Sequence, residues 1–359
     1  MANTVDPNFI VSTEINAPDC VFYDARRAPF KIYGLYNPED GRDFRRLPDD
    51  VAEATSKAVC ELHMHTSGGR VRFKTDSPYV AINAVMPRVE RDPHIPLTGE
   101  AGLDMYIKRC GFNEYAATFI PPQDMEKGYT SIHRFPNREM REITINLPLY
   151  NPLSELHIGL SEDAVIEEHS PYTFEKPVVY YGSSITHGGC ASRPGMAYPA
   201  IISQKLDCNF INLGFSGNAK AEVAMMEYIA SLPMSVFVYD YDHNAPTLEH
   251  LIETHMRGYR IVREKNPDLP IIMATRTLGD NYPRGSKAYE QFNAHRNTIM
   301  KSYITAWEEG DRNVYFLDGS SIFDGESFHA CTVDGTHPTD LGFFRMAKAF
   351  GKQVQRVIK

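Results

Sequence analysis

Four short segments in the second half of the chain carry residue types suited to acyl transfer. A serine pair lies in 182–186, a glycine-rich stretch in 212–218, an Asp-His-Asn run in 242–244 and an Asp-x-x-His pair in 334–338. A serine hydroxyl becomes an effective nucleophile when an imidazole accepts its proton and a carboxylate fixes the tautomer of that imidazole. These residue types therefore predict chemistry that proceeds through an acylated serine.

The placement of these segments supports the same prediction. The first three each follow an apolar run that we expect to be a parallel strand, and the fourth precedes the last helix-like segment. In open parallel sheets the reacting groups collect beyond the carboxyl ends of the strands. We therefore expect one serine, one glycine, one asparagine and the Asp-x-x-His pair to converge on a single rim of the sheet.

The order of these residues resembles that of the SGNH (GDSL-type) hydrolase family, over roughly residues 177–359. The resemblance implies that Ser184 is the nucleophile, His337 the base and Asp334 its orienting partner. It also implies an oxyanion hole made by the amides of Ser184 and Gly217 and by the Asn244 side chain. Donors of this kind stabilise the negative charge of the transition state, and losing one costs about 2.7–4 kcal/mol of barrier. A glycine at 217 would let a backbone N–H approach the substrate closely.

A second, shorter resemblance lies in the first half of the chain. The run Gly102-Leu103-Asp104-Met105-Tyr106 is similar to the G-x-D-L-Y signature of a β-sandwich domain that precedes the catalytic domain in one branch of these esterases. That branch implies an esterase acting on acetylated carbohydrate, with no cofactor and no metal.

The sequence departs from the family pattern at two of these segments. Ser183 stands where the family has an aspartate before the nucleophile, and the third segment reads Asp242-His243-Asn244 in place of Gly-x-Asn. Ser183, Asp242 and His243 are therefore candidate pocket residues. Capping and turn hydrogen bonds are an equally good account of Asp242 and His243.

The elements that must position these residues differ between the two halves of the chain. Within residues 1–170, apolar and polar residues alternate, and this period of two predicts antiparallel strands of a jelly-roll-like β-sandwich, with a hairpin turn at 67–69. The clearest alternating runs are 70–76, 79–86, 104–110 and 141–147.

Residues 177–359 show continuous apolar runs separated by helical patterns. Such runs are typical of parallel strands buried on both faces, so the pattern predicts an α/β three-layer, flavodoxin-like domain. The expected strands are 178–182, 210–214, 235–240, 270–275 and 313–318. The expected helices are 197–206, 219–232, 247–265, 287–309 and 341–358.

Composition argues against several classes of partner. The 359 residues include 37 Lys and Arg against 46 Asp and Glu, a net charge of −9, and no long basic run suggests nucleic-acid binding. No apolar run is long enough to cross a membrane, and the first residues lack the pattern of a signal peptide, so we expect a cytoplasmic protein. The six scattered cysteines are expected to be reduced thiols, most of them in the core.

His63 and His65 form an H-x-H pair that could in principle bind zinc. A zinc site would need two further ligands nearby, and the flanking sequence is typical of a hairpin. We therefore expect the two histidines to alternate on a solvated strand face, with no metal.

Three functions are compatible with this reading. The favoured one is a serine esterase that removes a short acyl group, in particular acetyl, from a carbohydrate such as a hemicellulose oligosaccharide. The alternatives are an acyltransferase that uses the same serine, and a carbohydrate-binding protein with an inactive hydrolase domain.

The loops 188–195 and 280–287 would set the specificity, and the short connection at 167–177 predicts that the sandwich helps to build the substrate site. The sequence leaves a homo-oligomer open.

Overall fold

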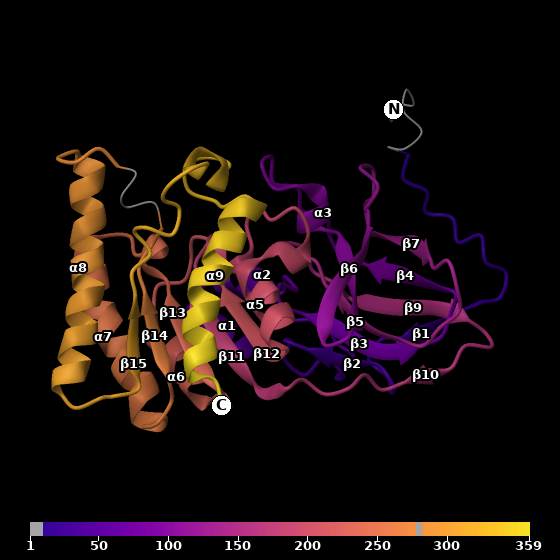
Figure 1. Cartoon of the computed structure of the whole chain (residues 1–359), viewed down its shortest axis with the longest axis horizontal. Helices are drawn as coiled ribbons and strands as arrows, with labels where there is room; N and C mark the ends of the chain where they lie inside the picture. The colour runs from indigo at the N-terminus through magenta and orange to yellow at the C-terminus, as the bar shows by residue number, and fades with distance from the viewer. Residues whose placement is uncertain (1–9, 278–281) are drawn as a thin grey trace.

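The computed structural model describes residues 10–277 and 282–359. Antiparallel sheets form the first half of the chain, and a parallel sheet flanked by helices forms the second (Figure 1). The predicted fold class is thereby confirmed. The first residues, used above to predict the compartment, and the beginning of the 280–287 loop lie outside the described residues.

Two antiparallel sheets make up the sandwich. One has the order β1 (Cys20–Asp24), β9 (Glu155–Ser161), β4 (Tyr79–Val85) and β7 (Gly128–Arg134). The other has the order β10 (Ile166–Glu167), β3 (Arg70–Thr75), β8 (Arg141–Asn146), β5 (Leu103–Arg109) and β6 (Phe112–Phe119), and β2 (Lys31–Tyr33) pairs with β3. Alternate residues of both sheets, such as Phe73 and Ile82, meet in one core without solvent exposure. The alternating apolar residues therefore face the core as predicted, but the opposite face of β3 is buried as well, because Arg70 and Arg72 lie against the second half of the chain.

The second half is built on a parallel five-stranded sheet. Its order is β12 (Cys208–Gly214), β11 (Phe174–Gly182), β13 (Val236–Asp240), β14 (Ile271–Ala274) and β15 (Val314–Leu317). All four pairings are parallel. The residues of β13 are all buried, as expected for a strand covered on both faces.

Helices cover both faces of this sheet. One face packs against α5 (Tyr198–Leu206) and α9 (Asp340–Val357). The other packs against α6 (Val223–Ser231), α7 (Leu248–Lys265) and α8 (Lys287–Glu308). Three of these helices are capped by a hydroxyl oxygen that accepts a backbone N–H of the first turn. The hydroxyl groups belong to Thr247, Ser286 and Thr339.

Two short helices of the first half also pack on the α/β core. They are α1 (Asp49–Thr55) and α2 (Lys57–Leu62), whose Ala52 and Val59 join the same hydrophobic cluster as α6. The predicted hairpin around His63 is therefore wrong, because the preceding residues bury a helical face. The turn at 67–69 links α2 to β3 and not two strands, so that the hairpin prediction there is also wrong.

Buried arginines join the sandwich to the edge strand β12. The Arg46 guanidinium donates to the carbonyl oxygens of Asn212 and Gly214 at 3.1 and 2.6 Å, and that of Arg70 donates to Phe210 O at 3.1 Å. Both side chains are almost fully buried. An edge strand exposes unpaired carbonyl groups, and these arginines satisfy them.

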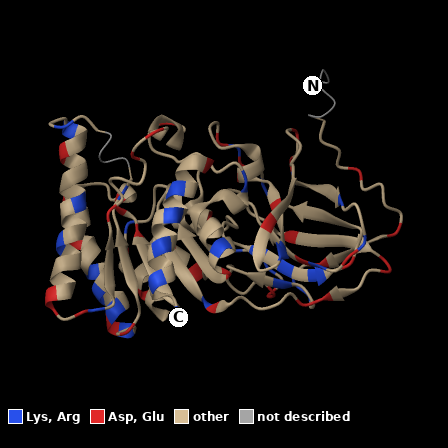
Figure 2. Ribbon diagram, in the orientation of Figure 1, with Lys and Arg blue, Asp and Glu red and all other residues tan. Residues whose placement is uncertain are grey.

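Charged residues of both signs are interspersed over the two halves (Figure 2). Within residues 10–277 and 282–359, no helix is long and apolar enough to cross a membrane. All six cysteines are free thiols, and three of them, Cys190, Cys208 and Cys331, are buried.

Candidate active site

Ser184 lies where strand β11 ends and α4 (Ser184–His187) begins. The Ser183 hydroxyl caps this helix by accepting the Ile185 N–H at 3.2 Å. Ser183 is only 1% exposed, so its side chain serves the helix start below the rim and does not line an open pocket. A serine thus supplies a cap at the position where the family pattern has an aspartate.

A hydrogen-bonded chain runs from Ser184 through His337 to Asp334. Ser184 Oγ lies 2.9 Å from His337 Nε2, and His337 Nδ1 lies 2.7 Å from Asp334 Oδ2. The second carboxylate oxygen accepts the backbone N–H groups of Thr336 and His337 at 2.9 and 2.8 Å. The three-residue spacing therefore lets one loop hold the carboxylate against both the ring and the backbone.

The carboxylate of Asp334 is strongly held in its charged form. Partial burial favours the neutral acid, but hydrogen bonds from the His337 ring and from the two amides outweigh burial and lower the pKa of Asp334 to about 2. A charged Asp334 keeps the proton of the neutral His337 ring on Nδ1 and leaves Nε2 free to accept the serine proton.

Gly217 and Asn244 lie on adjacent loops at the same rim. Gly217 is exposed with φ of +68°, and a Cβ there would meet no atom within 4 Å, so the space beside it is open. Asn244 Nδ2 donates one hydrogen to the carbonyl of Phe215 at 2.9 Å, which ties the Asn244 side chain to the loop that carries Gly217. The second hydrogen of that amide remains available to a substrate oxygen.

Asp242 is a structural anchor for this segment. It is fully buried, and its carboxylate accepts the backbone N–H and the Nε–H of Arg276, both at 3.2 Å. Burial opposes its charge, but the Arg276 cation outweighs it and lowers the pKa of Asp242. Sequence reasoning missed Arg276, although it follows β14 and the rule of strand ends could have found it.

His243 lies beside Asp242 on the catalytic side of this segment. Burial and the Arg276 charge lower the pKa of His243 to about 4, and the charge of a protonated His337 acts in the same direction. His243 is therefore neutral at pH 7 and adds no cation to the rim. It remains a candidate pocket residue.

Two residues of the first half reach the same site, and sequence reasoning missed both. His94 Nε2 lies 3.8 Å from Asp334 Oδ2, and its ring centroid is 5.7 Å from that of His337. The Tyr150 hydroxyl donates to the carbonyl of Ser184 at 3.2 Å, and its ring stacks on His187 at 4.0 Å. Neither belongs to a motif, since docking of the two halves alone brings them to the rim.

The loop 188–195 is held between the two halves. The hydroxyl of Thr98, in α3 (Leu97–Glu100), donates to Ser192 O at 2.6 Å. From the other side, Asp340 at the start of α9 accepts the Ser192 N–H at 2.9 Å. The loop that flanks Ser184 therefore depends on the sandwich for its position.

The structure does not place His63 and His65 on a solvated strand. Both are buried, at 5% and 2% exposure, and each imidazole has a carboxylate partner. His63 Nε2 lies 3.1 Å from Asp49, and His65 Nε2 lies 3.2 Å from Glu90. The predicted solvated face is wrong because this segment follows α2 into the interface of the two halves.

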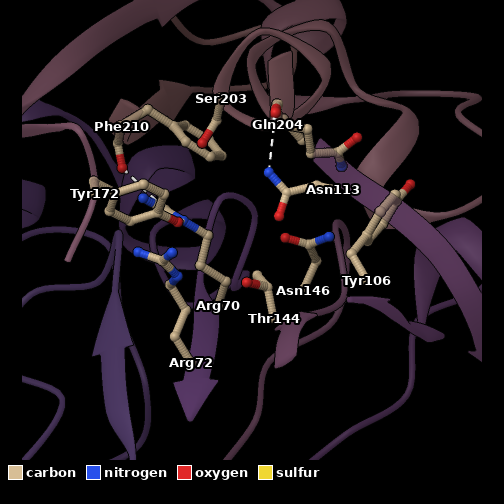
Figure 3. Close-up of a pocket in the computed structure, with 11 residues that line it drawn as sticks. Arg70, Arg72, Tyr106, Asn113, Thr144, Asn146, Tyr172, Ser203, Gln204 and Phe210 are labelled. Carbon is tan, nitrogen blue, oxygen red and sulfur yellow. Dashed lines mark hydrogen bonds between the residues drawn. The ribbon is translucent and has the colours of Figure 1, made fainter. Parts of the chain in front are cut away.

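A separate polar cavity lies between the sandwich and the α5 and β12 region (Figure 3). Arg70, Arg72 and Asn146 face Ser203 and Phe210 across it. The space open to the centre of a water molecule is about 10 Å³, room for roughly one water. The described residues that line it include none of those expected to act in catalysis, so it is an interface cavity.

The chain belongs to the GDSL-like lipase/acylhydrolase family, whose model matches residues 175–358. Residues 20–166 match the N-terminal GxDLY domain of SGNH-hydrolase-type esterases. Both predicted resemblances are confirmed. No curated protein matches the chain significantly.

Several solved structures share the whole two-part architecture. A protein from Bacteroides ovatus described as a GDSL-like lipase is 31% identical, with a TM-score of 0.85, over 95% of this chain and 99% of that one. The salicylyl-acyltransferase SsfX3 from a tetracycline biosynthetic pathway is 21% identical, with a TM-score of 0.74, over 95% and 98% of the two chains. A family two carbohydrate esterase from Cellvibrio japonicus is 11% identical, with a TM-score of 0.61, over 94% and 98%. The last two likenesses establish the fold alone.

Proposed function

We propose that the protein is a serine esterase that removes short acyl groups, acetyl above all, from carbohydrate. Ser184 is the nucleophile, His337 the general base and Asp334 the residue that orients it. The observation that carries this proposal is the continuous hydrogen-bonded chain of these three side chains at the rim of the parallel sheet. Membership of an acylhydrolase family supports it independently.

The reaction then follows from the geometry. His337 Nε2 accepts the Ser184 proton while Oγ attacks the ester carbonyl, and the new oxyanion accepts hydrogen bonds from the amides of Ser184 and Gly217 and from Asn244. His337 next gives the proton to the departing sugar oxygen, leaving an acyl-serine. Water attacks the acyl-serine with His337 again as base, and the carboxylic acid leaves as the free serine is restored.

The openness of the site favours hydrolysis over acyl transfer. The side chain of Asp334 is 36% exposed and that of His94 47% exposed, and the space at Gly217 is unfilled. A transferase must keep water away from its acyl-enzyme. An open rim gives water access to the acyl-serine and so favours hydrolysis. The intact hydrogen-bonded chain favours an enzyme over an inactive binding protein. The alternative of an acyltransferase rests on the fold shared with SsfX3.

The carbohydrate assignment rests on two observations. The family two carbohydrate esterase from Cellvibrio japonicus has the same two-part architecture. The sandwich also brings the exposed His94 side chain to the catalytic rim, where it extends the surface available to an alcohol group larger than the acyl group, while the buried Tyr150 supports the Ser184 backbone from beneath. A sugar carrying an acetyl ester fits such a site, with the acetyl group at Ser184 and the ring toward the sandwich.

Covalent labelling and substrate screening test the proposal together. A fluorophosphonate should label the wild type and the Ser192→Ala variant, and Ser184→Ala should abolish labelling. Hydrolysis of 4-nitrophenyl acetate, of acetylated xylan, mannan and chitin oligosaccharides, and of the same esters with added alcohol acceptors should then identify the acyl acceptor. Labelling that persists in Ser184→Ala would refute the nucleophile. Transfer of the acetyl group to the added alcohols, in preference to release of free acetate, would establish the transferase.

A further inference from the structure

We propose that His94, Cys190 and His337 form a binding site for a thiophilic divalent cation such as Zn²⁺, and that metal bound there inhibits the enzyme. Each of the three side chains offers one ligand atom, and these atoms all lie within 4.8 Å of one another. His94 comes from the sandwich, Cys190 from the loop after α4 and His337 from the loop before α9. The site therefore exists only when the two halves are docked.

The donor set matches the preferences of zinc. Zinc binds cysteine sulfur at about 2.3 Å and imidazole nitrogen at about 2.0–2.1 Å, in a tetrahedron whose ligand atoms are about 3.5 Å apart. The three ligand atoms, which now lie within 4.8 Å of one another, must therefore approach by up to about 1.3 Å. The His94 side chain is 47% exposed and free to move toward the buried Cys190, while water completes the fourth position.

The charges around the cluster favour a cation. Asp334 Oδ2 lies 3.8 Å from His94 Nε2, and both Asp334 and Asp92 act on the Cys190 thiol. Binding replaces the sulfur–hydrogen bond of Cys190 by a sulfur–zinc bond and releases the proton to solvent.

The inhibitory effect rests on the proposed role of His337. A metal on Nε2 occupies the lone pair that must accept the Ser184 proton. A metal on Nδ1 takes the place of the proton that is hydrogen-bonded to Asp334, so the neutral ring must carry its one N–H on Nε2. A protonated Nε2 cannot accept the Ser184 proton. Coordination through either ring nitrogen thus removes the base from the reaction.

Metal binding can be measured without reference to activity. Co²⁺ added to chelator-treated full-length protein should give a thiolate-to-cobalt charge-transfer band, and Zn²⁺ should displace it. Cys190→Ser should lose the band, whereas Cys110→Ser, which removes the exposed thiol, should keep it. Absence of the band in the wild type, or its persistence in Cys190→Ser, would overturn the site.

Inhibition is measured on the same proteins with 4-nitrophenyl acetate. Zn²⁺ should inhibit the wild type reversibly, with recovery on chelation. With each protein's rate normalised to its own metal-free rate, Cys190→Ser should require about 10-fold more Zn²⁺ or more for half inhibition. Equal inhibition of wild type and Cys190→Ser would overturn the proposal, as would a cobalt band with no effect of zinc on the rate. A metal-free wild type that never hydrolyses esters would refute the esterase, and the cobalt band would still decide the metal site.

Discussion

Gly99 of the sandwich packs against Ala191 of the catalytic half so closely that a Cβ on Gly99 would lie 2.0 Å from the Ala191 carbonyl oxygen. No side chain fits in that space without moving the backbone of one half. Ala191 adjoins Cys190 in the loop that flanks Ser184. The position of this catalytic loop therefore depends on a glycine more than eighty residues earlier in the sequence.

Gly99→Ala should displace the 188–195 loop. We expect the free energy of unfolding to fall by about 1–3 kcal/mol, as for other overpacked sites, together with a lower kcat/KM. Gly351→Ala in α9 is the matched control, because its Cβ would meet its nearest neighbour at 3.4 Å, an ordinary contact. Denaturant unfolding and ester hydrolysis measure both effects. A Gly99→Ala protein as stable and active as the control would contradict this account of the interface.

Arg46 provides a second test of the docking of the two halves. Arg46→Met retains much of the side-chain volume but leaves the Asn212 and Gly214 carbonyl groups of β12 without these donors. A buried unsatisfied group costs about 1–3 kcal/mol, and we expect a loss of stability in that range. Arg42→Met is the control, since that exposed ion pair should contribute less than about 1 kcal/mol. Equal melting temperatures for the two variants would argue against a stabilising role for Arg46.

The fold could be predicted to a large extent because burial leaves a periodic trace in the sequence. The alternating run at 79–86 became β4, and the continuous run at 235–240 became β13, each within one residue. The short helix α2 was missed because six residues are too few to display a helical period. The H-x-H spacing that follows it suggested a strand instead, and the tertiary contacts of this segment override that local pattern.

The candidate site could be predicted only in its motif-bearing part. The strand-end rule placed Ser184 and Asn244 on one rim, and the structure brings them there. His94 and Cys190 carry no sequence signal, because their approach to His337 depends on how two loops meet across the interface. From the sequence, Asp242 was equally compatible with lining a pocket and with stabilising a turn. Its buried ion pair with Arg276 gives it a structural role.

Glu100 should make stability depend on pH. Burial is the largest influence and raises its pKa from 4.5 to about 7. Between these pH values Glu100 loses its proton in the unfolded chain but retains it in the folded chain. The contribution of Glu100 to the free energy of unfolding is therefore greatest below pH 4.5 and decreases as pH rises toward 7. Glu100→Gln should flatten this slope, whereas Glu39→Gln, at an exposed site, should leave it unchanged. Unfolding free energies across this range provide the measurement. Parallel curves for the wild type and Glu100→Gln would contradict the prediction.

Asn244 is expected to act on the transition state. Asn244→Ala should lower kcat about 10²–10³-fold with little change in KM, as for other oxyanion donors. Asn244→Asp keeps the shape but replaces the donor with a negative charge, so its loss should be at least as large. Steady-state kinetics on 4-nitrophenyl acetate separate kcat from KM. A rise in KM at constant kcat would assign Asn244 to substrate binding.

The final prediction concerns the pair His337 and Asp334. His337→Ala should lower kcat by about 10⁴-fold or more, because it removes the ring nitrogen that lies 2.9 Å from Ser184 Oγ and is expected to accept its proton. Asp334→Asn should cause a comparable or milder loss, since an amide in place of the carboxylate disturbs the ring tautomer but leaves the base present. His329→Ala, which removes an exposed histidine of the neighbouring 3-10 turn, should leave the rate unchanged.

The pKa of about 2 for Asp334 makes it possible to distinguish a loss of activity from a loss of folded structure as pH falls. Its hydrogen bonds to His337 favour the charged carboxylate, so they stabilise the fold above the usual aspartate range and are lost only as pH falls toward 2. Activity lost on mild acidification should therefore recover on neutralisation without refolding, because Asp334 keeps its charge over that range. In Asp334→Asn the rate should stay low at every pH at which the protein is folded. Full activity of this variant at high pH would show that the carboxylate does not orient His337.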